Sequence, residues 1–400
     1  MFNIFKNNTT IKKSRLLPVI GGMMLMAAGL SSCEDNIIYE EDKDCHPGIN
    51  LRFVYDYHME KDANAFPANV DCVTVYVLDM ENNYVGKFFS ETTDVLRDES
   101  YRMHIPLDEG QYRLLVYGGM SCDHSTFNFS PDWQYDTRAF GHRDDIRVTL
   151  PVNENGVSDK KLHDIDERWG GLFYGYLDVT ITESDWQSIP DCRTETVYLM
   201  KDTNTIQVIL QELSQPDQMN HEDYIFQIID DNFVLDGYNG IVKTATDSYQ
   251  PMYTPYEQET KTMGTIQVGD HNGDQAVEDY TKILKVAFAE FATSRLHVDN
   301  LDTARLVVYT HKEHNLDGSP KEIINIPLIT YLLMTKGFGN NWIRPSDILA
   351  QRHPDANNTD QQFLDRQSNW SLIFFLQRNK WVKTHIVVNN WTVRVNDIEL

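Results

Sequence analysis

The stretch VDCVTVYVLD, residues 70–79, alternates its side chains in a way that decides the fold class. On an extended chain Val73, Val75 and Val77 fall on one face, and the residues between them, such as Tyr76, fall on the other. β-Branched and aromatic residues in this period-two pattern predict a β-strand that packs against a core. The neighbouring sequence therefore has to supply partner strands.

Six further segments of the first half have the same character. They are rich in aromatic and β-branched residues, and turn sequences such as Asp108-Glu109-Gly110 separate them. The segments are 49–57, 84–91, 101–107, 111–119, 145–151 and 172–182. Short strands with turns at this spacing predict a β-sandwich over residues 46–190.

The pattern changes at SIPDCR, residues 188–193, where Pro190 interrupts the strands and a second set begins. We predict that the second set opens with a hairpin over 195–210, and that LITYLLMTK at 328–336 forms one short helix. The chain is therefore predicted to be all-β, with a second β-sandwich over 191–400 that follows the first in tandem.

The N-terminus has the three zones of a secretory signal. Basic residues come first, LLPVIGGMMLMAAGL at 16–30 is apolar, and small residues precede Cys33. The apolar run is shorter than the roughly 20 residues that a membrane-spanning helix needs. LSSC at 30–33 resembles the lipobox of bacterial lipoproteins, whose cysteine is lipidated and begins the mature chain. We therefore predict a lipoprotein signal peptide over 1–32 and lipidation at Cys33; an ordinary signal peptide with an incidental cysteine is the alternative.

The next segment, 33–45, is predicted to be an acidic tether. Six of the residues from 34 to 44 are Asp or Glu, which favours a hydrated, self-repelling chain. Acids directly after a lipidated cysteine also resemble the surface-export signal of Bacteroidales lipoproteins, and a plain acidic linker is the alternative. We expect acyl chains on Cys33 to hold the protein to the outer membrane, exposed at the cell surface, because each buried methylene contributes about 0.8 kcal/mol.

Four cysteines remain beside the lipidation site: Cys45, Cys72, Cys122 and Cys192. An even number in an exported chain favours two disulfides, and four cysteines allow three pairings. All four lie in the first half of the chain, so we expect bridges to stabilise the N-terminal domain. Buried free thiols are the alternative.

The composition excludes several classes of function. The chain has 60 acidic and 35 basic residues and a formal net charge of −25, and a surface this acidic repels the phosphates of nucleic acids. The sequence has no G-x-S-x-G, no glycine-rich phosphate loop and no C-x-x-C. HEDYI at 221–225 and DHNGD at 270–274 lack the spacing of zinc and calcium motifs. We expect no enzyme, no cofactor, no metal site and no nucleic-acid partner.

A long stretch at 121–145 has little strand character but many aromatic residues. They are Phe127, Phe129, Trp133, Tyr135 and Phe140. Loops of this length in compact domains are often functional, so an interaction surface is one prediction. The other is that these rings pack over an open end of the sandwich.

Several segments together resemble one family. LRFVYDYHMEKDANAFPANVDCVTVYVLD and GQYRLLVYGGMSC resemble the N-terminal domain of the FimB/Mfa-type fimbrial anchor lipoproteins of Bacteroidales, a fimbrillin-like family. IPLITYLLMTK and NNWTVRVNDIEL resemble its C-terminal domain. The resemblance runs from about Cys45 to Leu400 and implies two tandem transthyretin-like β-sandwiches. Cys33 is the one functional residue that it carries over with its role.

The resemblance implies a base or anchor subunit that holds a fimbria to the outer membrane and limits its growth, with fimbrillin-like structural subunits as partners. Strand physics fits this role, because the edge strands of a sandwich can accept a strand from another chain. A surface glycan-binding lipoprotein of a nutrient-uptake system is the second hypothesis. An accessory or tip fimbrial adhesin and a surface hydrolase are the remaining ones.

Overall fold

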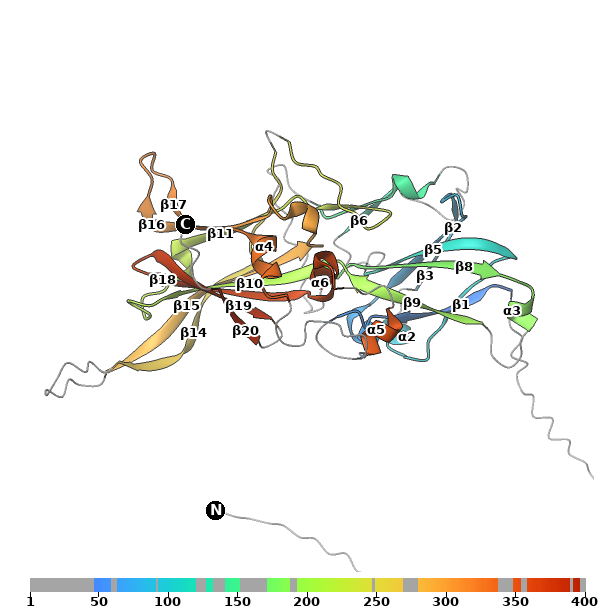
Figure 1. The fold of residues 1–400 in the computed structure, drawn as a ribbon, viewed down its shortest axis with the longest axis horizontal. Coiled ribbons are helices and arrows are strands. Elements are labelled where there is room, and N and C mark those ends of the chain that lie inside the picture. Colours follow the sequence, from blue (N-terminus) through green and yellow to red (C-terminus); the bar gives the residue numbers. More distant parts are fainter. Residues whose placement is uncertain are drawn as a thin grey trace, which may run out of the picture. The chain divides into compact units, whose positions relative to one another are not determined.

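The computed structural model describes residues 47–58, 63–90, 93–119, 127–131, 141–151, 171–187, 193–246, 249–268, 280–336, 348–353, 358–388 and 391–395. This part of the chain is mostly β, with several sheets and a few short helices (Figure 1). The fold class expected from the sequence is confirmed at this level. Residues 44–400 form one compact unit. The predicted signal peptide, Cys33 and the tether lie outside the described residues.

The first sheet has seven strands in the order β3-β2-β5-β8-β9-β1-β4. Its strands are β1 (Ile49–Val54), β2 (Val73–Leu78), β3 (Tyr84–Ser90), β4 (Met103–Ile105), β5 (Gly110–Gly118), β8 (Phe173–Ile181) and β9 (Thr194–Lys201). β8 and β9 pair through only three residues each, Phe173–Gly175 with Leu199–Lys201. Side chains of β1 and β9 share one core with those of β2, β5 and β8, so the sheet folds over at this short ladder into a sandwich.

The valine face predicted from residues 70–79 lies in this core. Val73, Val75 and Val77 are fully buried and belong to the same cluster as Leu51 of β1. Tyr76, on the opposite face of β2, is only 2% exposed, because a second layer covers that face too. β2 is therefore buried on both sides.

A three-stranded sheet, β12-β7-β6, supplies part of the second layer. β6 (Asn128–Ser130) and β7 (Arg147–Thr149) come from the first half of the chain, whereas β12 (Val234–Asp236) comes from the second. Val148 and Leu235 pair across this sheet and belong to one continuous core with Tyr76 and Tyr117. The two halves of the chain therefore share a sheet and a core.

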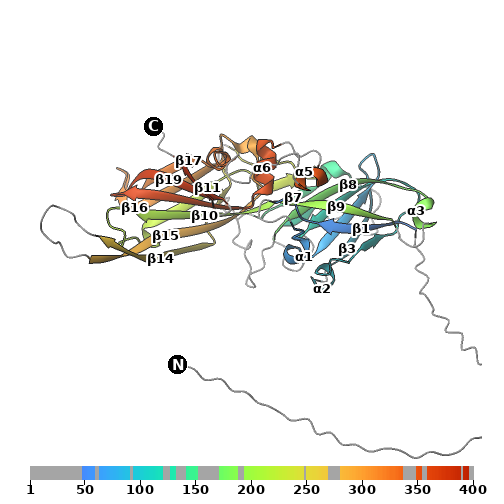
Figure 2. The same cartoon turned by 60° about the horizontal axis from the view of Figure 1, so that its bottom comes forward.

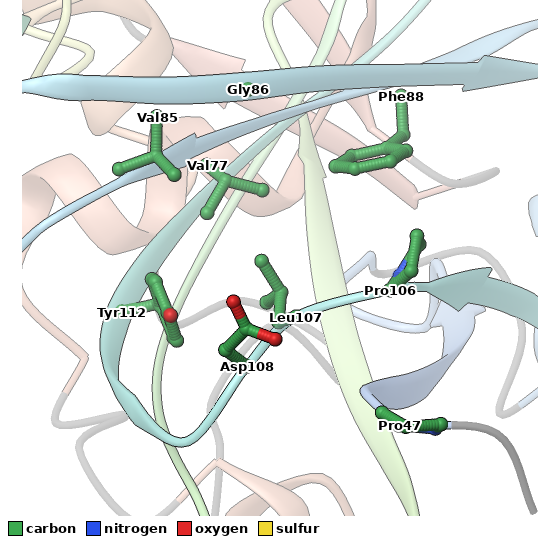
Figure 3. A pocket seen from close by; sticks show the side chains of 9 residues that line it. All are labelled: Pro47, Val77, Val85, Gly86, Phe88, Pro106, Leu107, Asp108 and Tyr112. Atoms are coloured by element: carbon green, nitrogen blue, oxygen red, sulfur yellow. The ribbon is translucent and has the colours of Figure 1, made fainter.

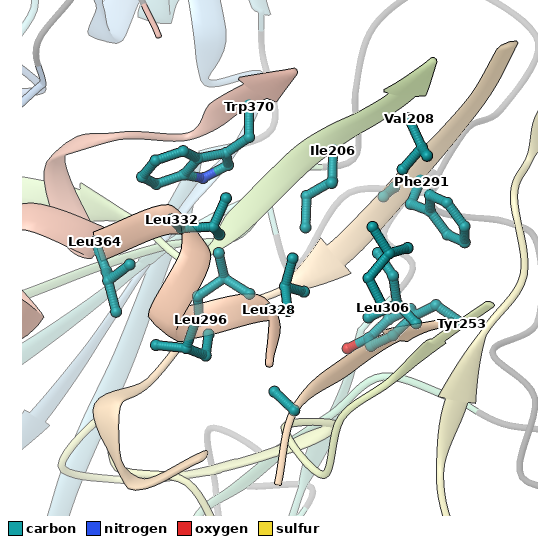
Figure 4. Packing of buried hydrophobic residues seen from close by; sticks show 14 of the residues in the cluster. Ile206, Val208, Tyr253, Phe291, Leu296, Leu306, Leu328, Leu332, Leu364 and Trp370 are labelled. Atoms are coloured by element: carbon teal, nitrogen blue, oxygen red, sulfur yellow. The ribbon is translucent and has the colours of Figure 1, made fainter. Parts of the chain in front are cut away.

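The second half adds two larger sheets. The six-stranded sheet has the order β14-β15-β10-β18-β19-β20, with β10 (Thr203–Glu212), β14 (Glu257–Val268), β15 (Tyr280–Ser294), β18 (Asn369–Gln377), β19 (Lys380–Val388) and β20 (Trp391–Val395). The four-stranded sheet has the order β13-β11-β16-β17, with β11 (Tyr224–Ile229), β13 (Met252–Tyr253), β16 (Arg305–His314) and β17 (Pro320–Pro327). Their inner faces meet in one apolar core, to which Ile206, Leu306 and Trp370 belong (Figure 4).

Short helices close the ends of these sheets. They are α1 (Phe66–Asn69), α2 (Thr93–Leu96), α3 (Ser184–Gln187), α4 (Leu328–Leu333), α5 (Ile348–Arg352), α6 (Asp360–Arg366) and the 3-10 turns η1 (Arg143–Asp145), η3 (His221–Asp223) and η4 (Val298–Asn300). The predicted helix at 328–336 is confirmed as α4, which ends at Leu333 and buries Leu328, Ile329, Tyr331 and Leu332. Thr359 caps α6 by accepting a hydrogen bond from the amide of Gln362.

The predicted hairpin over 195–210 is wrong. β9 pairs with β1 and β8 in the first sheet, whereas β10 pairs with β15 and β18 in the six-stranded sheet (Figure 2). Between them Asp202 is fully buried, and its amide donates to the carbonyl of Leu172 at 2.7 Å. Polar residues that read as a turn in the sequence are here hydrogen-bonded inside the protein. Strand pairing therefore changes at Asp202, and the boundary at 190/191 stays a prediction.

Asp202 and a second buried carboxyl group, Asp230, have raised pKa values. Burial raises the pKa of Asp202 to about 7, against the opposing charge of Arg295 at 3.8 Å and a hydrogen bond from Asn239. Burial likewise raises the pKa of Asp230 to about 7, although Asn300 donates a hydrogen bond to it. Between pH 4 and 7 the folded protein thus holds protons that the unfolded chain releases.

Stability should fall as the pH rises through this window. An acid whose pKa is higher in the folded than in the unfolded chain stabilises the fold at low pH, below the unfolded value of 3.8. As the pH rises to about 7 this contribution is lost, at up to about 1.4 kcal/mol per pH unit for each group. Asp230→Asn cannot ionise, so it should flatten the slope of the free energy of unfolding measured with urea at pH 5, 6, 7 and 8. The exposed Asp302→Asn is the control. An unchanged slope in the Asp230 variant would contradict the assignment.

Candidate functional site

A pocket of about 300 Å³ opens between the edge strand β3 and the segment that follows β4 (Figure 3). β3 and β4 are the two ends of the seven-stranded sheet, and the fold-over brings both to the same side of the sandwich. The lining residues are Pro47, Val77, Val85, Gly86, Phe88, Pro106, Leu107, Asp108 and Tyr112. We call this feature the β3–β4 groove.

The walls of the groove are the outer edges of the two end strands of the seven-stranded sheet. Among the strands that the structure describes, β3 pairs in this sheet with β2, and β4 pairs with β1. The start of β3 is covered, because the amide of Tyr84 donates to the carbonyl of Gly141 at 2.7 Å. Val77 of β2 faces Gly86 and Leu78 faces Tyr84, which leaves Val85 as a bulge. The accessible edge of β3 thus begins at the bulge, a common device at exposed edges.

The groove is lined mainly by apolar side chains, and Asp108 and Tyr112 supply its polar groups. Val77 is fully buried and forms part of the floor, whereas Val85 and Phe88 are partly exposed above it. Gly86 keeps the groove open, since a Cβ atom there would meet the Phe88 ring only at 3.6 Å. Burial raises the pKa of Tyr112, so its hydroxyl stays a neutral donor. An apolar channel between two strand edges suits an extended peptide whose alternate side chains are apolar.

The described residues hold neither a cluster of metal ligands nor a membrane-spanning helix. In these ranges no three His, Cys, Asp or Glu side chains gather as metal ligands. Among the helices that the structure describes, none has the length and apolarity needed to cross a membrane.

The aromatic residues predicted at 121–145 are only partly described. Phe127 is 4% exposed and lies in the core. Phe129 stacks on Tyr76, with ring centroids 4.6 Å apart, and meets Tyr117 edge-on at 5.8 Å. These two rings therefore pack against the sandwich, Phe127 in the core and the half-buried Phe129 on its aromatic neighbours. Trp133, Tyr135 and Phe140 lie outside the described residues.

The predicted cysteine sites are also described in part. Cys72 is fully buried and disulfide-bonded. Cys33, Cys45, Cys122 and Cys192 lie outside the described residues, so the pairing stays a prediction.

Polar contacts of the buried Asp56, which the sequence did not reveal, connect the end of β1 to α5 and the residue after it. Asp56 has a 2% exposed side chain and accepts hydrogen bonds from Arg352 at 2.7 Å and His353 at 2.9 Å. Burial alone would raise the pKa of Asp56, but the two donors outweigh it and hold the pKa below its usual value. The His353 ring lies 4.7 Å from Tyr198 of β9. Partners almost 300 residues apart leave no local signal in a sequence.

A second missed feature is an exposed aromatic stack. Tyr176 and Tyr238 are 41% and 49% exposed, and the guanidinium of the buried Arg143 lies between them, 4.9 and 4.1 Å from their ring centroids. The Arg143 side chain donates to the carbonyl of Gly237 at 2.8 Å, and the Tyr238 hydroxyl donates to Asp144 at 2.7 Å. These contacts fix a polar, aromatic surface before any ligand arrives.

Comparisons with known proteins identify a family and related structures. The family profile of the fimbrillin-A associated anchor proteins Mfa1 and Mfa2 matches residues 41–397. A solved candidate adhesin from Bacteroides thetaiotaomicron is 34% identical, with a TM-score of 0.63, over 88% of this chain and 99% of that one. A candidate polysaccharide-binding protein from the same species is 25% identical, with a TM-score of 0.61 and the same coverage.

A more distant structure shares the fold. The fimbrial anchor protein Mfa2 from Porphyromonas gingivalis is 16% identical, with a TM-score of 0.54, over 88% of this chain and 99% of that one. No curated protein matches the chain.

Proposed function

Because the chain belongs to the family of the fimbrillin-A associated anchor proteins Mfa1 and Mfa2, we propose that it is the base subunit that holds a fimbria to the outer membrane. The observation that carries the proposal is the extent of the family match, which begins at residue 41, eight residues after Cys33, and runs to 397. The family consists of fimbrial anchors rather than enzymes. Beyond the predicted signal peptide and tether, almost the whole chain is family sequence.

In this proposal the protein is attached to the membrane through Cys33. The lipobox-like LSSC and the acidic residues that follow support acylation and then display at the cell surface. Two or more acyl chains give a stable attachment, whereas one chain gives only a marginal one. The hydrated tether then separates the folded sheets from the lipid surface.

The proposed contact with the fimbria is strand pairing between this protein and a fimbrillin-like subunit. The β3–β4 groove supports this role because it is apolar inside and its walls are the two end strands of the described seven-stranded sheet. A strand that entered it would gain main-chain hydrogen bonds from the edges and side-chain contacts from Val85, Phe88 and Leu107. A base subunit that takes one strand in this way, without passing one on, ends the polymer and so limits its growth.

A side chain that fills the groove should block subunit binding without changing the stability of the protein. Gly86→Leu projects a side chain into the groove, whereas Gly86→Ala adds one methyl at ordinary contact distance from Phe88. In a strain that lacks the native copy, the leucine variant should reduce cell-attached fimbriae counted by electron microscopy at least tenfold, and the alanine variant should restore them. Both variants should unfold at the wild-type temperature. Normal fimbriae with the leucine variant would exclude the groove as the contact site.

Glycan binding is a second candidate function, and the Tyr176–Arg143–Tyr238 stack is the observation that favours it. Exposed rings beside carboxylates are a common setting for sugars, whose C–H faces pack on aromatic rings. Pull-down of the purified chain on a panel of insoluble polysaccharides tests this function. Binding that Tyr238→Ala abolishes would support it, and a lack of binding to every member of the panel would remove it.

A further inference from the structure

Two buried polar side chains, Asp230 and Asn300, meet where the end of β11 lies beside η4. Asp230 directly follows β11 and is 2% exposed, and Asn300 is the last residue of η4 and is fully buried. The side-chain amide of Asn300 donates a hydrogen bond to Oδ1 of Asp230. One hydrogen bond therefore joins a carboxyl group and a carboxamide that are both shielded from solvent.

Each of these two side chains also has an oxygen atom without a donor. Oδ2 of Asp230 and Oδ1 of Asn300 are buried, and neither accepts a hydrogen bond from any residue that the structure describes. Buried polar atoms in folded proteins nearly always have a partner, because an unsatisfied one is costly. Two such atoms on groups that already share one hydrogen bond indicate a donor held between them.

A proton on Asp230 supplies this donor. A protonated carboxyl group has one O–H donor and one carbonyl acceptor, which match the acceptor and the N–H donor of a carboxamide. Nδ2 of Asn300 then donates to Oδ1 of Asp230, and Oδ2–H of Asp230 donates to Oδ1 of Asn300. An ionised carboxylate only accepts, so it would place a negative oxygen beside the carbonyl oxygen of Asn300.

Burial favours the protonated form of Asp230. It is the largest influence on this group and raises the pKa of Asp230 to about 7, against the hydrogen bond from Asn300 and the positive charge of Lys243. Lys243 is exposed, so solvent weakens its effect.

The other titratable groups around Asp230 do not reverse this preference. The negative charge of Asp231 favours the neutral form, although its backbone amide favours the ionised one. Burial raises the pKa of Tyr253 well above its usual value, so Tyr253 stays neutral. On η4 the ring of His297 lies 3.3 Å from Asp299, and burial lowers the pKa of His297, which keeps the ring neutral at pH 7.

We propose that the folded protein holds one proton in the Asp230–Asn300 pair, and that loss of this proton to solvent loosens segment 295–304. Asn300 holds the end of this segment, because its carbonyl accepts the amides of Thr303 and Ala304 at 3.1 and 2.8 Å. When the proton leaves, the pair loses one of its two hydrogen bonds and Asn300 faces a negative charge. The segment then opens more readily.

This proton switch reaches α6, because segment 295–304 connects β15 to β16 and binds that helix. Gln361 of α6 accepts the amide of Val298 at 2.9 Å and donates to the carbonyl of Leu296 at 3.1 Å. Arg295 pairs with Asp365 of the same helix at 2.9 Å. A rise in pH should therefore weaken the attachment of α6, whereas the sheets keep their own ladders. The switch is independent of the proposed anchor function.

Hydrogen exchange of the purified protein, followed by mass spectrometry at pH 5, 6, 7 and 8, tests the switch. Exchange rates of segment 295–304 are corrected for intrinsic amide exchange and given as protection factors. Opening releases the proton of Asp230, so protection should fall by up to about tenfold per pH unit to pH 7 and then level off. His297 acts in the opposite direction, since its folded pKa is lowered. Protection that does not fall between pH 5 and 7 would overturn the proposal, because an ionised Asp230 bridged by water has no proton to lose.

Variants assign the effect to the pair. Asp230→Asn keeps two hydrogen bonds as an amide–amide pair, so it should fold, and its protection should no longer fall with pH. The exchanged pair Asp230→Asn/Asn300→Asp should restore the fall, and the exposed Asp302→Asn should behave as wild type. An Asp230→Asn protein that does not fold, or that keeps the wild-type fall, would refute the shared proton.

Infrared spectroscopy gives a readout that does not depend on exchange. The wild type at pH 5.5 should show the carbonyl band of protonated carboxyl groups, and this band should be lost by pH 8.5. The band should be weaker in Asp230→Asn than in Asp302→Asn. Equal bands in the two variants would show that Asp230 carries no proton and would overturn the proposal.

Discussion

Cys33→Ala should release the protein and its fimbriae from the cell. The cysteine is the predicted site of acylation, and anchoring rests on acyl chains whose buried methylenes contribute about 0.8 kcal/mol each. Losing two or more acyl chains removes on the order of 10 kcal/mol of membrane affinity, so the expected effect is all or none. We expect no incorporation of labelled palmitate, and fimbriae of normal appearance in the culture medium under electron microscopy.

Ser32→Ala is the control for this variant, because it changes the neighbouring residue and keeps the cysteine. It should remain labelled and attached. Palmitate labelling that persists in Cys33→Ala would place the acylation elsewhere. Fimbriae that stay on the cell although the labelling is lost would show that another subunit holds them.

Trp370→Ala should have the largest effect on folding of any single side-chain truncation. The indole is 2% exposed, meets Phe363 of α6 edge-on with ring centroids 5.8 Å apart, and lies in the core between the larger sheets (Figure 4). Truncation of a buried tryptophan costs about 3–5 kcal/mol, against a typical total stability of about 5–15 kcal/mol. Urea denaturation followed by circular dichroism should show the midpoint falling sharply.

Leu316→Ala is the matched control, because this apolar side chain at the tip of the β16–β17 hairpin is fully exposed. Its free energy of unfolding should change by no more than about 0.5 kcal/mol. A Trp370 variant as stable as the Leu316 variant would contradict the core described here.

Many strands were predictable because their signal is local. Alternation in 70–79 and the turn residues around it are visible within ten positions, and β2 lies where this pattern places it. β6 was missed, because it lies in the stretch 121–145, which has little strand character in the sequence. The same holds for α4, whose apolar spacing is helical.

The pairing of strands was not predictable in the same way. β9 reads as the first arm of a hairpin, yet it pairs with β1, about 144 residues earlier, and β12 pairs with β7 across the expected boundary. Such choices depend on which apolar faces meet in three dimensions, and a period-two pattern fits many partners equally well. The β3–β4 groove and the Asp56 contacts followed from these pairings and were therefore missed. The packing of Phe127 and Phe129 was one of two readings that the sequence left open.

The parallel ladders between β1 and β9 and between β10 and β18 also set the order of events after synthesis. β1 has to wait for residues near 194, and β10 has to wait for residues near 369. Closing loops of this length costs chain entropy before the strand contacts that offset it can form. Folding should therefore be slow compared with that of helical proteins. β6 and β7 of the first half also share a sheet with β12 of the second half. The first half therefore cannot complete its fold until β12 has been synthesised. Until then its apolar faces stay open to aggregation, and a nascent chain of this design benefits from a chaperone that holds it unfolded until its last strands are available.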